Sequence, residues 1–301
     1  MKSPFDSARA LRYAGTLLGA VLLAATSPSA KATLIAYDGF NYAAGQTVVG
    51  QGTNAGWSGA GDPYTISAGN STNASIEASD MNTGNGLLTS GNQLNLDGSA
   101  PGGNEGVYRN LGATYNTAGN IYWFSALMQV DNNLGVSYAG VSLFSNSNED
   151  FFFGQRNHAN TWGIEQHAGS TANSLVSAAN STSAFLVVEL NGITHTASLY
   201  VNPNLSTGAI PAKASTSLTF TDFSFNRFRA EAGVETLDVD ELRLGTTYAD
   251  VTPSASAIMQ SPEPPAALCV ALLLLGMPAL RALRMGLVRQ QRSKNHTTEP
   301  L

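Results

Sequence analysis

The sequence has few charged residues and even fewer basic ones. Of its 301 residues, 12% are charged. Between positions 33 and 261 there are six Lys or Arg and eighteen Asp or Glu residues, a formal net charge of −12. Because phosphate binding needs clustered Lys and Arg, this stretch is not predicted to bind nucleic acid.

Cysteine is almost absent. The one cysteine, Cys269, lies in an apolar run near the C-terminus, so the preceding residues contain no thiol. Residues 33–261 therefore have no disulfide framework and no Cys-paired zinc motif. A stretch of this length can still bury a sizeable core without disulfides.

Long helical periods are missing between residues 33 and 244. Short apolar or alternating runs recur there, separated by Gly, Asn, Ser and Asp, and this pattern predicts strands joined by turns. The predicted strands span 33–38, 74–78, 86–96, 106–111, 120–130, 138–145, 150–155, 161–167, 184–192, 195–202, 217–223 and 236–245. These strands are too many for one open sheet. We therefore predict an all-β fold, a two-sheet antiparallel jelly-roll sandwich.

The clearest hairpin spans residues 185–202. Alternate positions from Leu186 to Leu190 are apolar, and so are those from Ala197 to Val201. Asn191-Gly192 between them supplies turn residues. We expect both apolar sets to face the same core.

The N-terminus has the pattern of a secretory signal peptide. Three basic residues precede the apolar run 14–25, which is too short to span a bilayer comfortably. Ala30 and Ala32 provide small residues at the −3 and −1 positions of a cleavage site. We therefore predict a signal helix within residues 1–32 and a mature chain that starts at Thr33.

The C-terminus has a different targeting pattern. Pro262, Glu263 and Pro264 precede the apolar run 265–280, and basic residues follow it. This order predicts a transmembrane helix whose basic flank stays on the cytoplasmic side. Residues 262–292 resemble the PEP-CTERM sorting signal of Gram-negative bacteria. The resemblance implies that an exosortase cuts near the Pro-Glu-Pro motif, and that the protein is exported through the inner membrane.

These signals divide the chain into five parts. They are a signal peptide (1–32), a jelly-roll domain (33–250), a linker (251–261), a sorting signal with a membrane helix (262–292), and a basic and polar tail (293–301). Before processing, the C-terminal helix would anchor the protein in the inner membrane. After processing, we expect the protein at the cell surface or outside the cell.

Several segments of the domain resemble one family when taken together. They are LIAYDGFNYAAG, GWSGAG, NIYWFSALMQV, AGVSLF, FGQ, LVVELNG, ASLYVNP and VDELRLGTTYADV. The set is similar to the concanavalin A-like (laminin G-like) jelly-roll domains of PEP-CTERM proteins. This resemblance implies a fold more than an activity. Laminin G-like relatives often bind glycans or surface proteins, and some carry a structural calcium ion.

Asp240 is the candidate metal ligand. Strand alternation predicts that it shares a face with Leu242 and Leu244, where a carboxylate must be neutralised or hydrogen-bonded. The resemblance points to Asp38, on the first strand, as its neighbour if the terminal strands pair. We therefore expect either a structural calcium ion at Asp38 and Asp240 or loop N–H groups that donate to Asp240. No other cofactor is expected.

No catalytic residues are predicted. Related glycoside-hydrolase sandwiches carry a Glu-x-Asp-x-Glu strand. Here Thr236 lies two positions before Asp238 and Asp240 lies two positions after it, so both glutamates of that motif are missing. The sequence also lacks a GxSxG elbow. Two histidines, His158 and His167, could meet Glu165 across a hairpin, yet zinc spacing is missing.

Trp162 is the predicted ligand platform, because it lies near a hairpin turn where its ring could stack on a sugar. The sequence as a whole favours an exosortase-sorted surface or matrix protein, structural or associated with extracellular polysaccharide. The expected partners are the exosortase and the secretion machinery. The alternatives are a glycan-binding module and, less favoured, a glycoside hydrolase or lyase.

Overall fold

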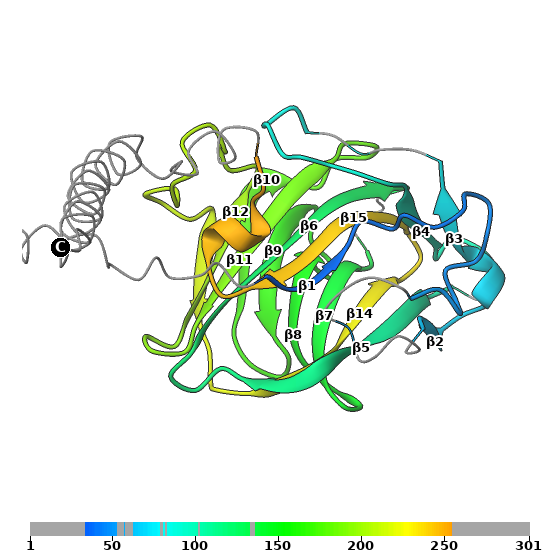
Figure 1. Cartoon of the computed structure of the whole chain (residues 1–301). Helices are drawn as coiled ribbons and strands as arrows, with labels where there is room; N and C mark the ends of the chain where they lie inside the picture. Colours follow the sequence, from blue (N-terminus) through cyan, green and yellow to red (C-terminus); the bar gives the residue numbers. More distant parts are fainter. Residues whose placement is uncertain are drawn as a thin grey trace, which may run out of the picture. The chain divides into compact units, whose positions relative to one another are not determined.

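The computed structural model describes residues 34–254, apart from 53–56, 58–62, 79–80, 82, 102 and 133–135. Within these residues, fifteen strands form two antiparallel sheets that pack as a sandwich (Figure 1). The predicted all-β fold, a two-sheet antiparallel jelly-roll sandwich, is confirmed.

Sheet A has eight strands among the described residues. In spatial order they are β13 (Thr216–Thr219), β12 (Thr196–Val201), β11 (Ala184–Asn191), β6 (Ile121–Asp131), β15 (Thr236–Gly245), β4 (Gln93–Asp97) and β3 (Ala74–Glu77), while β1 (Leu34–Asp38) pairs with β15. Sheet B has seven. They are β10 (Thr171–Ser177), β9 (Thr161–Gln166), β8 (Asn148–Gln155), β7 (Ala139–Ser145), β14 (Ser224–Ala232), β5 (Glu105–Asn116) and β2 (Thr65–Ala68).

Strand alternation explains how the main core forms between the sheets. Along β6, Phe124 and Ala126 point inward and join this core. Trp123 and Leu127 point to the other side of sheet A and join a second apolar cluster. Successive side chains of a strand face opposite sides, so a strand that is apolar at nearly every position serves both clusters.

The second cluster lies on the outer face of sheet A, beneath a short helix. Tyr248 and Val251 of α2 (Tyr248–Val251) pack there with Leu87 and Leu205. Figure 1 shows this helix, in orange, lying over sheet A. Because Ser254 forms a bridge with Leu87, the folded unit reaches Ser254 and includes four residues of the predicted linker.

The predicted hairpin is confirmed. In β11 and β12, Leu186 pairs with Val201 and Asn191 pairs with Thr196. The Asn191 side chain accepts hydrogen bonds from the N–H groups of the next turn residues, Ile193 and Thr194, at 3.1 Å each. This is the local bonding that favours Asn in turns.

Three strands of the described part were not predicted, namely β2, β10 and β14. The most important is β14, which lies between β5 and β7 in sheet B. Its alternation was present in the sequence, because Phe228 and Ala230 face the core while Arg227 and Arg229 face outward. The predicted strand over 86–96 is confirmed only from Gln93 onward.

The terminal targeting predictions lie outside the described residues. They concern Ala30 and Ala32, the motif Pro262-Glu263-Pro264, and the apolar segments beside them. Among the residues that the structure does describe, no helix has the length and apolar character to span a membrane.

Candidate functional site

Asp38 lies at the end of β1 on the inner face of sheet A. It pairs in register with Leu242, a residue of the main core, and its side chain is fully buried. Its carboxylate forms an ion pair with Arg109, which reaches across from β5 in sheet B. The terminal strands β1 and β15 pair as expected, but the charge of Asp38 is balanced by a guanidinium group.

Three neutral groups also donate hydrogen bonds to Asp38. They are the N–H of Phe40 at 2.9 Å and the hydroxyls of Tyr42 and Tyr64 at 2.9 and 3.0 Å. Burial raises the pKa of Asp38, and Arg109 opposes this shift. Burial, followed by the nearby Asp38 charge, also raises the pKa of both tyrosines, so their hydroxyls remain donors.

Asp240 does not share a face with Leu242 and Leu244, and that prediction is wrong. A bulge in β15 at Glu241, where φ is 52°, shifts the register against β6. Val239 and Leu242 both pack in the main core although they lie three positions apart. The bulge therefore moves Asp240 to the opposite side of the sheet from the leucines.

The structure does not bring Asp38 and Asp240 together. Asp240 pairs with Leu127, a member of the outer cluster, whereas Asp38 faces the inner core. The Asp240 carboxylate accepts the N–H of Glu241 at 2.7 Å, which is the local hydrogen bond of the alternative prediction. No group of three His, Cys, Asp or Glu side chains in the described part of the chain is arranged to hold a metal ion.

Trp162 is not an exposed platform, and that prediction is wrong. It is the second residue of β9 and pairs with Gln155. Its side chain points between the sheets, on the same face as Ile164, and the residue is 1% exposed. Its position in a strand, rather than its closeness to a turn, determines where the ring lies.

The outer face of sheet B carries a row of glycines across neighbouring strands. Gly140 of β7 pairs with Gly154 of β8, which pairs with Gly163 of β9. A Cβ atom at Gly140 would lie 2.7 Å from the Phe152 ring, and one at Gly163 would lie 3.0 Å from Cδ of Arg156. Larger residues in this row would displace both side chains, so the glycines let them lie flat on the sheet.

A pocket of about 250 Å³ opens beside the glycine row. We call it the outer-face pocket; its lining includes Tyr138, Glu149, Phe152, Arg156, Glu165 and Arg229. Nε of Arg156 lies 2.9 Å from Oε2 of Glu165, and Nη2 of Arg229 lies 3.0 Å from Oε2 of Glu149. His167, which also lines it, is 3.9 Å from Glu149.

A third carboxylate, that of Glu231, pairs with Arg229 but does not line the pocket. Its Oε2 is 2.6 Å from Nη2 of Arg229, and its Oε1 accepts the hydroxyl of Tyr138 at 3.1 Å. Burial raises the pKa of Glu231, and the Arg229 charge opposes that shift. The pocket therefore combines an aromatic ring with fixed hydrogen-bonding groups, the combination that many small-ligand sites use.

The sequence did not indicate this pocket as a site. Glu165 and His167 were considered there only as zinc ligands, and zinc spacing was missing. The signal that could have found the pocket is the alternation of Arg227, Arg229 and Glu231 along β14. The alignment of Gly140, Gly154 and Gly163 could not be seen in the sequence, because it depends on how three strands pair.

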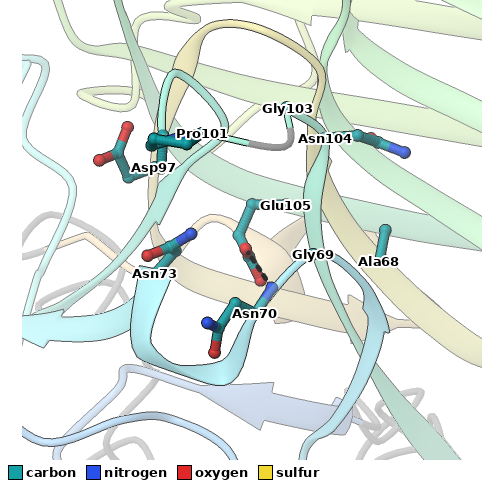
Figure 2. A pocket seen from close by; sticks show the side chains of 10 residues that line it. Ala68, Gly69, Asn70, Asn73, Asp97, Pro101, Gly103, Asn104 and Glu105 are labelled. Atoms are coloured by element: carbon teal, nitrogen blue, oxygen red, sulfur yellow. Dashed lines mark hydrogen bonds between the residues drawn. The ribbon is translucent and has the colours of Figure 1, made fainter.

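A second hollow, which we call the loop pocket, is lined by residues that follow β2 and β4 and by the start of β5. Figure 1 shows β2, β3 and β4 together at one end of the sandwich. Its volume is about 400 Å³. Figure 2 shows Glu105 reaching from the start of β5 toward the turn at Gly69 and Asn70, with Asn73 beside it and Asp97 across the pocket.

The described part of the chain is thus an antiparallel jelly-roll sandwich with a polar pocket on one outer face. No protein family model and no curated protein matches the chain. Its fold is similar to solved structures with 8 to 13% sequence identity and TM-scores of 0.34 to 0.42.

Three of these structures illustrate the range. A sialidase matches 62% of this chain with 11% identity and a TM-score of 0.42. The binding domain of botulinum neurotoxin serotype D matches 62% with 11% identity and a TM-score of 0.39. An alginate lyase from Corynebacterium sp. matches 60% with 13% identity and a TM-score of 0.34. The matched parts are 17%, 44% and 79% of those chains, and likenesses this weak do not indicate a shared function.

Proposed function

We propose that this protein is an exported surface protein that binds extracellular polysaccharide through the outer-face pocket, without cleaving it. The observation that carries the proposal is the pocket itself, where the Phe152 ring lies on the glycine row beside two Arg–Glu pairs. Phe152 is only 8% exposed, so contact with a sugar rests mainly on the paired charged groups, which offer fixed donors and acceptors for sugar hydroxyls.

The charges of the pocket favour a neutral polysaccharide. Arg156 is paired with Glu165, and Arg229 is paired with both Glu149 and Glu231. Three carboxylates against two guanidinium groups leave a formal excess of one negative charge. A uronic acid would therefore approach like charge without an unpaired guanidinium to receive it.

Binding should depend on Arg156. We expect wild-type protein to bind neutral polysaccharides on a glycan array, and Arg156→Ala to weaken that binding by roughly 10-fold or more, because a charge-assisted donor is lost. Arg227→Ala is the matched control, since Arg227 lies on the same face but bonds Asn110 and does not line the pocket. Melting curves of both variants check that the fold is retained.

Three results would contradict the proposal. Absence of binding to every neutral polysaccharide would leave a purely structural surface protein. Release of shortened or unsaturated products from a bound polysaccharide would indicate an enzyme. An equal loss of binding in Arg227→Ala would mean that the effect does not come from the pocket.

The terminal signals support export and sorting in this proposal. In a host with an exosortase, intact-mass measurement of surface material should find a chain that starts at Thr33 and lacks residues 265–301. Replacing Pro262, Glu263 and Pro264 by alanine should preserve the C-terminal segment. Surface material of the unaltered protein that still carries residues 265–301 would contradict the processing step.

A further inference from the structure

The chain contains two Asn-Gly dipeptides, and the structure places them in different surroundings. They are Asn85-Gly86, in the loop before β4, and Asn191-Gly192, at the turn between β11 and β12. An asparagine followed by glycine deamidates readily, because glycine has no Cβ to hinder the approach of its backbone nitrogen to the preceding side-chain amide. The two dipeptides can therefore be compared as two copies of one reactive group.

The side-chain amide is held in the same way in both dipeptides. Oδ1 of Asn85 accepts the N–H of Leu87 at 3.1 Å, and Oδ1 of Asn191 accepts the N–H of Ile193, also at 3.1 Å. Each bond runs to the residue two positions ahead, so the side chain folds back over the glycine peptide between them. The donated hydrogen bond also stabilises negative charge that develops on the amide oxygen during attack. The carbon that is attacked is therefore prepared at both positions.

The attacking backbone nitrogen is available in only one of the dipeptides. The N–H of Gly192 donates to the carbonyl oxygen of Asn120 at 2.8 Å, and the residue is buried. A Cβ atom at Gly192 would lie 1.7 Å from the carbonyl oxygen of Thr117, so the backbone there has no room to shift. Gly86 is exposed, and a Cβ atom there would have nothing within 4 Å. Its N–H donates to no other residue of the described part.

We propose that Asn85 is a site of spontaneous deamidation, and that the fold protects Asn191 from the same reaction. The backbone nitrogen of Gly86 forms a bond to Cγ of Asn85, and the side-chain nitrogen leaves as ammonia with the proton of the attacking N–H. Water then opens the succinimide ring at one of its two carbonyl carbons. The product at position 85 is an aspartate, or an isoaspartate whose backbone runs through Cβ. The reaction needs only water, and it is independent of polysaccharide binding.

Deamidation of Asn85 would act on the outer cluster. Its Nδ2 donates to the carbonyl oxygen of Pro203 at 3.4 Å, and a carboxylate in its place has no hydrogen to donate and would face that oxygen with a negative charge. Leu87 and Leu205, each two positions further along, are both buried in the cluster. An isoaspartate would also lengthen the backbone just before Leu87, which forms a bridge with Ser254. The modification therefore loosens two segments that pack on the outer face of sheet A.

Peptide mapping by mass spectrometry, on purified protein aged at mildly alkaline pH, tests the site. In the folded protein, the peptide with Asn85 should gain the mass of deamidation and separate into aspartate and isoaspartate forms. It should do so roughly 10-fold or more faster than the peptide with Asn191, whose glycine must first break its hydrogen bond. In urea the two rates should become similar. Asn85→Gln is the matched variant and should stay unmodified, because its longer side chain would have to close a larger ring.

Thermal melting of Asn85→Asp tests the effect on the outer cluster. We expect its Tm to lie about 2 °C or more below that of wild type, because a donor is lost and a charge faces a carbonyl oxygen. Asn204→Asp is the control, since it adds the same charge beside Pro203. Oδ1 of Asn204 accepts the N–H of Ser206 at 2.9 Å, a bond that a carboxylate keeps. This control should melt like wild type.

Three mapping results would overturn the proposal. They are no conversion at Asn85 in the folded protein, equal rates at Asn85 and Asn191 in the folded protein, and a difference in rate that persists unchanged in urea. The last result would assign the difference to the flanking sequence and not to the fold. An Asn85→Asp variant that melts like wild type would overturn the effect on the outer cluster.

Discussion

Replacing Arg109 by Met is expected to lower the free energy of unfolding by about 3 to 5 kcal/mol, because it leaves the buried Asp38 carboxylate without its counter-charge. Both side chains of this ion pair are completely buried. The hydroxyls of Tyr42 and Tyr64 would remain as donors, but they are neutral and cannot balance the charge.

Aromatic contacts add to the expected loss. The guanidinium carbon of Arg109 lies 4.6 Å from the ring centroid of Trp57 and 5.0 Å from that of Tyr64. Its Nε and Nη2 have no hydrogen-bond acceptor among the described residues, so besides Asp38 its favourable contacts are these rings and the Tyr42 hydroxyl, which accepts from Nη1 at 3.2 Å. Met retains much of the volume but provides no charge.

A double-mutant cycle measured by urea unfolding tests this prediction. Asp38→Asn alone should also destabilise the domain, because it leaves Arg109 buried and unpaired. The double variant Asp38→Asn with Arg109→Met should lose much less than the sum of the single losses. Additive losses, or a loss below about 1 kcal/mol for Arg109→Met, would show that the pair does not matter for folding.

The second large effect is a pH dependence that comes from Asp238. This residue is 3% exposed on β15, and its Oδ1 accepts the Nδ2 of Asn95 at 2.7 Å. Burial, aided by the charges of Glu77 and Asp131, raises the pKa of Asp238 to about 7. In the unfolded chain the pKa of an aspartate is about 4.

Because the folded pKa is the higher one, the folded state binds the proton more tightly. The stabilisation is fully present below about pH 4 and is lost as the pH rises through 7. Asp238→Asn should therefore make the domain more stable than wild type at pH 8, by roughly 2 to 4 kcal/mol. The amide mimics the protonated acid and can still accept from Asn95.

Urea unfolding at pH 5 and pH 8, in the presence of chelator, measures this effect. Wild type should lose stability between the two values, and Asp238→Asn should lose much less. Lys213→Gln, which removes a charge from an exposed side chain, is the control and should show the wild-type pH dependence. The prediction fails if Asp238→Asn and wild type have the same pH dependence.

The sequence alone predicted most strands, since a period of two is readable from a single chain. Leu186 and its alternate neighbours had to face one side, whichever strand lay beside them. The hairpin turn at Asn191 was also local, because its bonds go to residues two and three positions ahead. The prediction that residues 33–261 do not bind nucleic acid likewise rests on their low content of basic residues alone.

The candidate sites depended on information that was not local. Trp162 was assigned to the surface because of its neighbours in sequence, but its strand position turns it inward. Asp240 was assigned to the core side by strict alternation. One residue with positive φ, Glu241, reversed its side.

The sequence by itself determined the fold class and the turn chemistry, because both rest on contacts or patterns within a few residues. Only the tertiary structure decided that Asp38 pairs with Arg109, 71 positions away, and that glycines on three strands align in one row. The physical reason is that a buried charge takes whichever partner the packing of the two sheets provides. Strand register, set by the whole sandwich, determines which side chains meet on its surface.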